Sequence, residues 1–297
     1  MKLSLFFITL LSGLFFCANG QNKSEPSNVT LEYQHLHSKI FNNTRTLRIL
    51  LPPGYYNSGK NKIYKVLFLN DGQSLFNNDT CQFSHNEWRV DETVDSLINM
   101  KKIEPFIIVG IDNIGSKYRG KEYLPWEDIY LSPPIPHPMG PKYPDFIINE
   151  VLPFVKSKYR ISTKREDIGV GGSSYGALIA LYTYLKKSDD IGFLLLESPS
   201  FYVNEQAILK MFKSFNGALP EKISIGVGTN ELALKNCDES NPNNLMAVRD
   251  ATTLKDMFLS KGLDKKRLLL TVEKCAIHRE KAWAGRFPKD IQFLMHK

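Results

Sequence analysis

Ile168-Gly169-Val170-Gly171-Gly172-Ser173-Ser174-Tyr175-Gly176-Ala177 is the stretch that decides the fold. A short apolar run leads into Gly172-x-Ser174-x-Gly176, and an apolar segment follows at once. This order predicts a strand, a sharp turn and a helix, with Ser174 at the turn. Glycines on both sides of the serine let the strand and the helix approach each other closely. The stretch predicts a nucleophile elbow, although a glycine-rich turn with an inert serine fits the same five residues.

Short buried strands alternate with helical segments along most of the chain. Strands at 30–37 and 44–51 are joined through Asn42-Asn43 and predict an antiparallel hairpin. Apolar runs predict further strands at 65–69, 105–111, 192–196, 222–227 and 267–272, and another that ends at 171. Helical spacing predicts helices at 91–100, 144–159, 205–215, 245–261 and 282–295, and one from the turn to about 186. The pattern predicts an α/β fold: a mostly parallel sheet, an antiparallel N-terminal hairpin and helices on both faces.

A serine nucleophile needs a base, and the base needs an acid that orients it. His278 is the histidine that follows a late buried strand and precedes the final helix. The chain order serine, acid, histidine places the acid after strand 222–227, where Glu231 stands, with Asp238 as the second candidate. A helix-capping histidine and a surface glutamate are the simpler interpretations of His278 and Glu231.

The negatively charged intermediate of acyl transfer needs two backbone N–H donors. Tyr175 follows the nucleophile and supplies the first candidate donor. Gln73 supplies the second, because it follows an early buried strand at Asp71-Gly72, where glycine permits close approach. An ordinary Asp-Gly turn explains the same residues without any role in catalysis.

Several segments of the chain match one family. They are 64–76 (YKVLFLNDGQSLF), 88–91 (WRVD), 108–113 (IVGIDN), 122–126 (EYLPW), 172–176, 197–200 (ESPS), 228–231 (GTNE) and 278–283 (HREKAW). The chain thereby resembles the esterase family of α/β-hydrolases that includes enterochelin esterases, feruloyl and acetyl-xylan esterases and S-formylglutathione hydrolase. The resemblance covers most of the chain and implies an α/β-hydrolase fold and ester hydrolysis.

The resemblance also implies roles for single residues. The family's nucleophile falls on Ser174 and its histidine on His278, whereas the acid varies within the family. Asp112, Asn113, Tyr123 and Trp126 follow another strand and resemble the family's pocket wall, although loop packing explains them equally. Cys275-Ala276-Ile277 depart from the small or acidic residues that often precede the family's histidine.

After removal of the N-terminal segment three cysteines remain, which in an exported chain allow one disulfide and one free thiol. Cys237 and Cys275 lie in the loops of the proposed acid and histidine, which should be neighbours. A disulfide between them fits an oxidising compartment, and two buried thiols fit equally well. Cys81 would be left as a free thiol.

The N-terminus is typical of a secretory signal peptide over residues 1–20. Lys2 precedes a short apolar run, and Ala18-Asn19-Gly20 forms a small-x-small cleavage site before Gln21. Cys17 offers a lipoprotein alternative, which the bulky Phe15-Phe16 disfavour. We expect residues 21–297 to form a single domain, since no linker or repeat divides them, and we expect a secreted or periplasmic location.

These patterns favour a serine esterase that acts on small-molecule or glycan-linked esters, such as a polysaccharide-linked acyl group or a siderophore ester. An acyltransferase with the same residues, or a non-catalytic binding protein on this scaffold, are the alternatives. The formal net charge of +7 comes from scattered lysines, which does not favour nucleic-acid binding. No metal-ligand spacing or dinucleotide fingerprint occurs, so we expect no metal and no cofactor. None of the patterns bears on the oligomeric state.

Overall fold

The computed structural model describes residues 28–81, 86–232 and 236–296. The predicted signal peptide, with its Cys17, lies outside these residues. Within them the chain folds around one eight-stranded sheet, whose strand order is β1-β2-β4-β3-β5-β6-β7-β8. The strands are β1 (Thr30–Ser38), β2 (Asn43–Leu51), β3 (Val66–Asn70), β4 (Ile107–Ile111), β5 (Ile168–Ser173), β6 (Phe193–Glu197), β7 (Lys222–Gly228) and β8 (Leu268–Glu273).

The pairing of the strands matches the prediction from sequence. β1 and β2 form an antiparallel hairpin, and β2 also pairs antiparallel with β4. All other neighbours in the sheet are parallel. The expected α/β fold, with a mostly parallel sheet and an antiparallel N-terminal hairpin, is therefore confirmed.

Helices separate the strands. They are α1 (Val90–Asn99), α2 (Ser116–Tyr123), α3 (Tyr143–Asp145), α4 (Leu152–Lys158), α5 (Tyr175–Lys186), α6 (Val203–Lys213), α7 (Pro242–Ser260) and α8 (Glu280–Met295). A π-helical segment, Phe146–Val151, joins α3 to α4, so the predicted helix 144–159 is one continuous element. Pro153 at the start of α4 has no N–H to donate to the preceding turn, which favours the wider π-turn there. Only α2 lacks a counterpart among the predicted helices.

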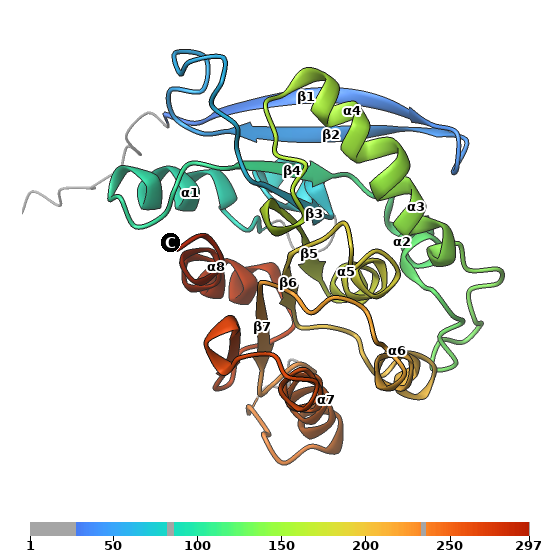
Figure 1. The fold of residues 1–297 in the computed structure, drawn as a ribbon. Helices are drawn as coiled ribbons and strands as arrows, with labels where there is room; N and C mark the ends of the chain where they lie inside the picture. Colours follow the sequence, from blue (N-terminus) through green and yellow to red (C-terminus); the bar gives the residue numbers. More distant parts are fainter. Residues whose placement is uncertain (1–27, 82–85, 233–235, 297) are drawn as a thin grey trace, which may run out of the picture.

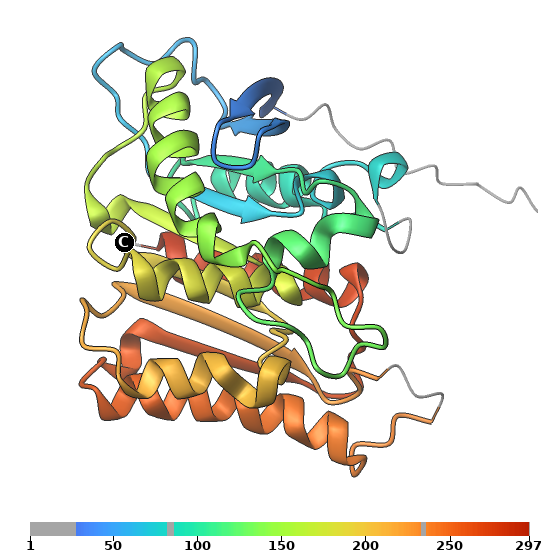
Figure 2. The ribbon, with the colours of Figure 1, turned by 90° about the vertical axis from the view of Figure 1, so that its right-hand side faces the viewer.

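The helices cover both faces of the sheet. Figure 1 shows α1 and α8 on one side and α4, α5, α6 and α7 on the other, and Figure 2 shows the second layer from its outer side. Two apolar clusters fill the space between the sheet and these layers. Alternate residues of a strand contribute to opposite clusters: Val66 and Phe68 of β3 pack into one, and Leu67 and Leu69 into the other.

The register of the parallel strands brings their carboxyl ends to one edge of the sheet. Asn70 at the end of β3 lies beside Ile111 at the end of β4, and Ser173 of β5 lies beside Glu197 of β6. Gly228 of β7 lies beside Glu273 of β8. Because loops that follow these ends meet at the same edge, ligands of such sheets bind there.

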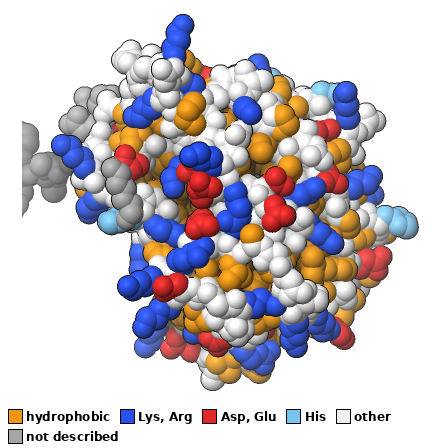
Figure 3. Space-filling model, in the orientation of Figure 1, with side chains coloured by type: hydrophobic (Ala, Val, Ile, Leu, Met, Phe, Trp, Pro, Cys, Tyr) orange, Lys and Arg blue, Asp and Glu red, His pale blue; other side chains and the backbone are white. Residues whose placement is uncertain are grey.

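The surface carries charges of both signs. Figure 3 shows basic, acidic and hydrophobic side chains interspersed over the face in view. Among the described residues, no helix is both long enough and apolar enough to span a bilayer.

Candidate active site

Ser174 lies at a sharp turn between β5 and α5. Its backbone has φ 57° and ψ −126°, a conformation that non-glycine residues rarely adopt. A Cβ atom at Gly172 would lie 2.9 Å from the carbonyl carbon of Gly176, and one at Gly176 would lie 2.9 Å from Oδ2 of Asp71. Close backbone packing therefore requires glycine at 172, and the Asp71 carboxylate leaves little room for a side chain at 176. Ser174 itself is half-buried and lines a cavity at this edge of the sheet.

His278 and Glu231 are joined by a hydrogen bond. Nδ1 of His278 lies 2.6 Å from Oε2 of Glu231. The other carboxylate oxygen, Oε1, accepts hydrogen bonds from Ser198 Oγ at 2.8 Å and from the Gly228 N–H at 2.6 Å. Burial alone would raise the pKa of Glu231, but these three donors and the charge of His278 outweigh it and hold this pKa below its usual range. Glu231 is thus an ionised carboxylate that fixes the orientation of the imidazole.

Asp238, the second candidate for the acid, lies elsewhere. Its carboxylate is exposed and accepts hydrogen bonds from the N–H and the hydroxyl of Ser240, which lower its pKa. The structure therefore places Glu231, and not Asp238, beside the imidazole.

Ser174 and His278 line one cavity of about 160 Å³. In this structure the Ser174 hydroxyl is 3.2 Å from the hydroxyl of Ser200, and no hydrogen bond joins it to His278. Hydrogen bonds between catalytic groups are often formed only when substrate is bound, so this geometry is compatible with a nucleophile and base pair.

The loop after β3 approaches Ser174 from the neighbouring strand. Asp71 has a left-handed backbone, with φ 60°, and its carboxylate accepts two hydrogen bonds of 2.7 Å from the Arg119 guanidinium. Both side chains are buried. A Cβ at Gly72 would lie 2.7 Å from the carbonyl carbon of Gly110 in β4, so only glycine fits where this loop passes β4. The rigid loop fixes the backbone of Gln73.

The two candidate N–H donors belong to Gln73, in the loop after β3, and to Tyr175, at the start of α5. Tyr175 is the first residue of α5, so its N–H has no acceptor within the helix. The side chain of Gln73 is buried and accepts a hydrogen bond of 3.1 Å from the Asn113 N–H. Among the described residues, neither the Gln73 nor the Tyr175 backbone N–H donates a hydrogen bond. Both groups are therefore available to a ligand.

The four predicted pocket-wall residues lie behind this loop. Asp112 is paired with Arg48 at 2.8 and 3.1 Å, although burial raises its pKa. Asn113 donates a 2.7 Å hydrogen bond to Asp71, and the buried Tyr123 hydroxyl accepts the Asp71 N–H at 3.2 Å.

Trp126, the fourth, packs edge-to-face on Tyr182, with ring centroids 5.5 Å apart. None of the four lines either of the two cavities at this edge of the sheet. Of the four, Asn113 and Tyr123 support the Asp71 loop, whereas Asp112 pairs with Arg48 and Trp126 packs on α5.

Residues that sequence reasoning missed form a network beneath Glu231. Ser198, at the end of β6, accepts hydrogen bonds from Trp283 Nε1 at 2.9 Å and Arg286 Nη2 at 3.3 Å while it donates to Glu231. Arg286 is buried and paired with Glu197 at 2.5 Å. Burial, reinforced by the charge of Asp290, raises the pKa of Glu197 well above its usual range, against the lowering by Arg286. The position of Ser198 directly after a strand was the sequence signal for this network.

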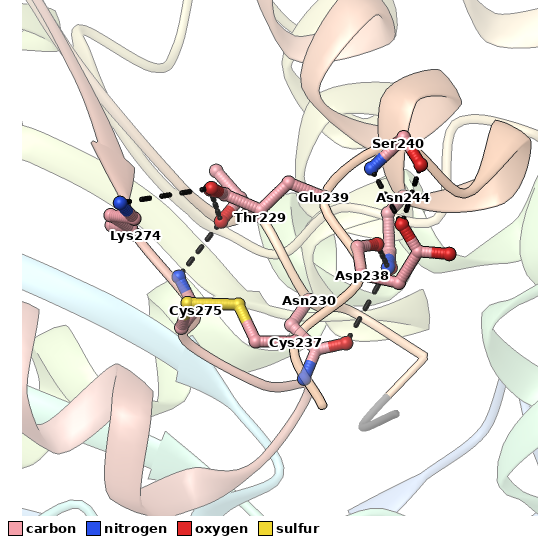
Figure 4. Close-up of a disulfide and its surroundings, with 9 residues drawn as sticks. All are labelled: Thr229, Asn230, Cys237, Asp238, Glu239, Ser240, Asn244, Lys274 and Cys275. Atoms are coloured by element: carbon pink, nitrogen blue, oxygen red, sulfur yellow. Dashed lines mark hydrogen bonds and ion pairs between the residues drawn. A yellow bond between two sulfur atoms is a disulfide. The ribbon is translucent and has the colours of Figure 1, made fainter. Parts of the chain in front are cut away.

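A disulfide ties the acid loop to the histidine loop. It joins Cys237 to Cys275, 38 residues apart in sequence. Figure 4 shows its surroundings, in which Thr229 accepts a 2.8 Å hydrogen bond from the Cys275 N–H. Of the alternatives left by the sequence, the structure has the disulfide, and Cys81 is buried and free. Glu239 lies beside the two sulfurs, but disulfide-bonded sulfurs supply no thiolate to a metal.

The fold and this arrangement define the class of the protein. A parallel sheet with a serine at a strand-to-helix turn, followed by an acid and a histidine after later strands, is the architecture of the α/β-hydrolases. The model of the family described as "Putative esterase" matches residues 38–294. The chain belongs to this esterase family and is a hydrolase that acts on esters.

The chain is similar to known proteins at low sequence identity. The uncharacterized protein YbbA of Bacillus subtilis (strain 168) is 22% identical over 255 residues, which cover 85% of this chain and 93% of that protein. A ferulic acid esterase is similar with a TM-score of 0.64 and 18% identity, covering 90% of this chain and 98% of that one. The enterobactin esterase FES from Shigella flexneri has a TM-score of 0.63 and 19% identity, covering 89% of this chain and 59% of that one.

Proposed function

We propose that the protein is a serine esterase in which Ser174 is the nucleophile, His278 the general base and Glu231 the orienting acid. The observation that carries the proposal is the hydrogen bond between Glu231 and Nδ1 of His278, at the sheet edge where Ser174 lines a cavity. A carboxylate that accepts a hydrogen bond from Nδ1–H keeps the proton on Nδ1 and leaves Nε2 free to accept the proton of a serine hydroxyl. The network through Ser198 holds this carboxylate in place.

The reaction proceeds through an acyl-enzyme. Ser174 Oγ attacks the ester carbonyl carbon while its proton passes to Nε2 of His278, and the carbonyl oxygen becomes an oxyanion. Collapse of this intermediate breaks the bond to the alcohol, which leaves with the proton from His278. Water then attacks the acyl carbon and gives its proton to His278. The second collapse releases the acid and returns the proton to Ser174.

The oxyanion of both intermediates is stabilised by the backbone N–H groups of Gln73 and Tyr175. They lie on the two segments that meet at Ser174, and the Asp71–Arg119 pair fixes the first of these. Donors that are already oriented for the oxyanion require no reorganisation during the reaction. We assign the Asp71 loop and its supports Asn113 and Tyr123 to this positioning role.

The substrate proposal rests on a proposed export of the chain. A disulfide persists in oxidising compartments, which supports the signal peptide proposed for residues 1–20. Export favours a nutrient ester, such as a polysaccharide-linked acyl group or a siderophore ester. The structural likeness to a ferulic acid esterase and an enterobactin esterase supports these two classes.

Hydrolysis of p-nitrophenyl acetate tests the nucleophile. We expect Ser174→Ala to lower kcat by about 10⁴-fold or more, because the acyl-enzyme can no longer form. Far-ultraviolet circular dichroism should show an unchanged fold. Hydrolysis by Ser174→Ala at the rate of the wild type would contradict the assignment.

A further inference from the structure

A second, larger cavity adjoins the proposed catalytic residues. It has a volume of about 580 Å³ and shares His278 and Arg279 with the smaller cavity at Ser174. Glu231 and Ser200 also line it. An ester bound at Ser174 therefore has room to place one of its two parts in this cavity.

One face of α7 forms a wall of the cavity. Its members are Asn243, Met246, Ala247 and Asp250, whose spacing puts them on the same side of the helix. The start of α7 is fixed to the acid loop, because Asn244 accepts a 3.0 Å hydrogen bond from the Leu232 N–H. With a helical rise of about 1.5 Å per residue, Asp250 lies about 10 Å further along the helix axis than Asn243. It is therefore at the end of this wall remote from Glu231.

Asp250 is a buried carboxylate that faces the cavity and has no strong cationic partner among the described residues. The residue is 5% exposed. Its ion-pair partner is Arg249 at 3.8 Å, a side chain that is 68% exposed and therefore well screened by solvent. Burial raises the pKa of Asp250, against smaller lowering effects of Arg249 and a hydrogen bond from Gln206. A buried carboxylate is stabilised when a charged partner arrives with the ligand.

A second wall of the cavity is aromatic. Phe201, Tyr202 and Tyr130 line it, and the rings of Tyr130 and Tyr202 meet edge-to-face with centroids 5.9 Å apart. Met246 adds an apolar surface from α7. Aromatic faces pack against alkyl chains and attract cations, so this wall suits a hydrocarbon chain that ends in a positive charge.

We propose that this cavity binds the part of an ester that carries a protonated amine at its far end, and that Asp250 is the residue that selects it. The proposal rests on the proposed esterase function. The chemistry at Ser174 is unchanged, and the cavity decides which ester is held there. Asp250 supplies a charged hydrogen-bond acceptor, and the aromatic wall covers the connecting chain.

Matched esters test the proposal by turnover. 4-Methylumbelliferyl 6-aminohexanoate is compared with the hexanoate and the adipate monoester for the acyl part, and 6-aminohexyl acetate with hexyl acetate for the alcohol part. In one of the two series we expect kcat/KM to be about ten- to hundredfold higher for the amine, the range for one charged hydrogen bond. Asp250→Asn should remove this preference, so that kcat/KM for the amine falls to that of the neutral ester measured with the same variant. Asp256→Asn, an exposed acid on the same helix, should keep it.

A second variant tests the amine preference without relying on Asp250→Asn alone. A binding measurement tests recognition of the amine without relying on turnover. Ala247→Lys places an ammonium group one helical turn from Asp250 and should also remove the preference for the amine. Calorimetric titration of Ser174→Ala protein with hexylammonium should show binding that Asp250→Asn abolishes.

Three outcomes would overturn the proposal. The first is a preference for the amine that persists in Asp250→Asn, and the second is the absence of that preference from both series. The third is an Asp250-dependent preference for the 4-methylumbelliferyl ester of 3-(4-hydroxyphenyl)propanoate over the amine, which would assign the cavity to a neutral donor. Failure of the esterase function is distinct, because then the neutral esters are not cleaved while hexylammonium still binds.

Discussion

At the scale of single residues, the environment of Glu231 separates it from Asp238, the other candidate for the acid. Three hydrogen-bond donors converge on its carboxylate, one of them His278. The carboxylate of Asp238 instead accepts a hydrogen bond from the hydroxyl of Ser240, two residues further along the chain. The roles of these two acids can therefore be distinguished by substitutions that preserve shape and remove charge.

We predict that Glu231→Gln lowers kcat by about 10³- to 10⁴-fold, since loss of the carboxylate removes stabilisation of the imidazolium and permits the wrong tautomer. Asp238→Asn should change kcat by less than about twofold, because its side chain is exposed and acts only in its own turn. Steady-state kinetics with p-nitrophenyl acetate measures both. The reverse order would move the acid to Asp238, and a small effect of both would indicate a Ser174–His278 pair that works without an acid.

The lowered pKa of Glu231 also predicts a pH dependence of stability. A carboxyl group whose folded-state pKa lies below its unfolded value stabilises the fold above the unfolded pKa, and this contribution is lost as pH falls through the folded pKa. The difference in unfolding free energy between wild type and Glu231→Gln should therefore be largest near neutral pH and shrink below about pH 4.3, the ordinary glutamate value. Urea unfolding at a series of pH values measures it, and a difference that grows in acid would contradict the prediction.

The sequence was informative about residues whose role follows from chain order. Ser174, Glu231 and His278 each follow a strand, so their common location could be predicted without knowledge of any loop, although β8 before His278 is half-buried and not buried as expected from its apolar sequence. Asp112 follows β4 and Tyr123 ends α2, but their side chains turn away from the cavities toward Arg48 and Asp71. Side-chain direction depends on partners distant in sequence, and for this reason neither these contacts nor Asp250 could be foreseen.

At the scale of elements, helices held by a regular apolar pattern could be predicted, and a helix held by partners distant in sequence could not. The strands and most helices bury apolar residues at a regular spacing, which is visible in the sequence. Helix α2 buries Arg119, Glu122 and Tyr123 instead. Arg119 pairs with Asp71 and Glu122 with Arg45, so this helix is held by buried ion pairs. An apolar pattern is absent from such a helix, and periodicity cannot detect it.

The disulfide is the covalent link between the acid loop and the histidine loop. We predict that a double variant, Cys237→Ser with Cys275→Ser, lowers the free energy of unfolding by about 2–4 kcal/mol, since the 38-residue separation is released in the unfolded chain. Urea unfolding measures this change. Cys81→Ser is the control and should cost less, because serine keeps the hydrogen bonds that Cys81 Sγ donates to Asn77 and Asn86. Equal losses in the two variants would contradict the prediction.

At the scale of the whole molecule, the parallel sheet explains why residues from five loops meet. Asp71, Ser174, Ser198, Glu231 and His278 follow β3, β5, β6, β7 and β8 in turn. Carboxyl ends of parallel strands lie at one edge, so the fold itself gathers these side chains. The fold class could be predicted for the same reason, because strand and helix alternation is a property of the entire sequence.

Labelling with a fluorophosphonate tests the central claim most directly, because this reagent modifies a serine only when a neighbouring base activates it. We predict one label per wild-type chain, located on Ser174 by peptide mass spectrometry, and much slower labelling of His278→Ala. The adjacent Ser173→Ala variant should label normally, and Ser174→Ala should not label. A label on any other residue, or undiminished labelling of Ser174→Ala, would contradict the account.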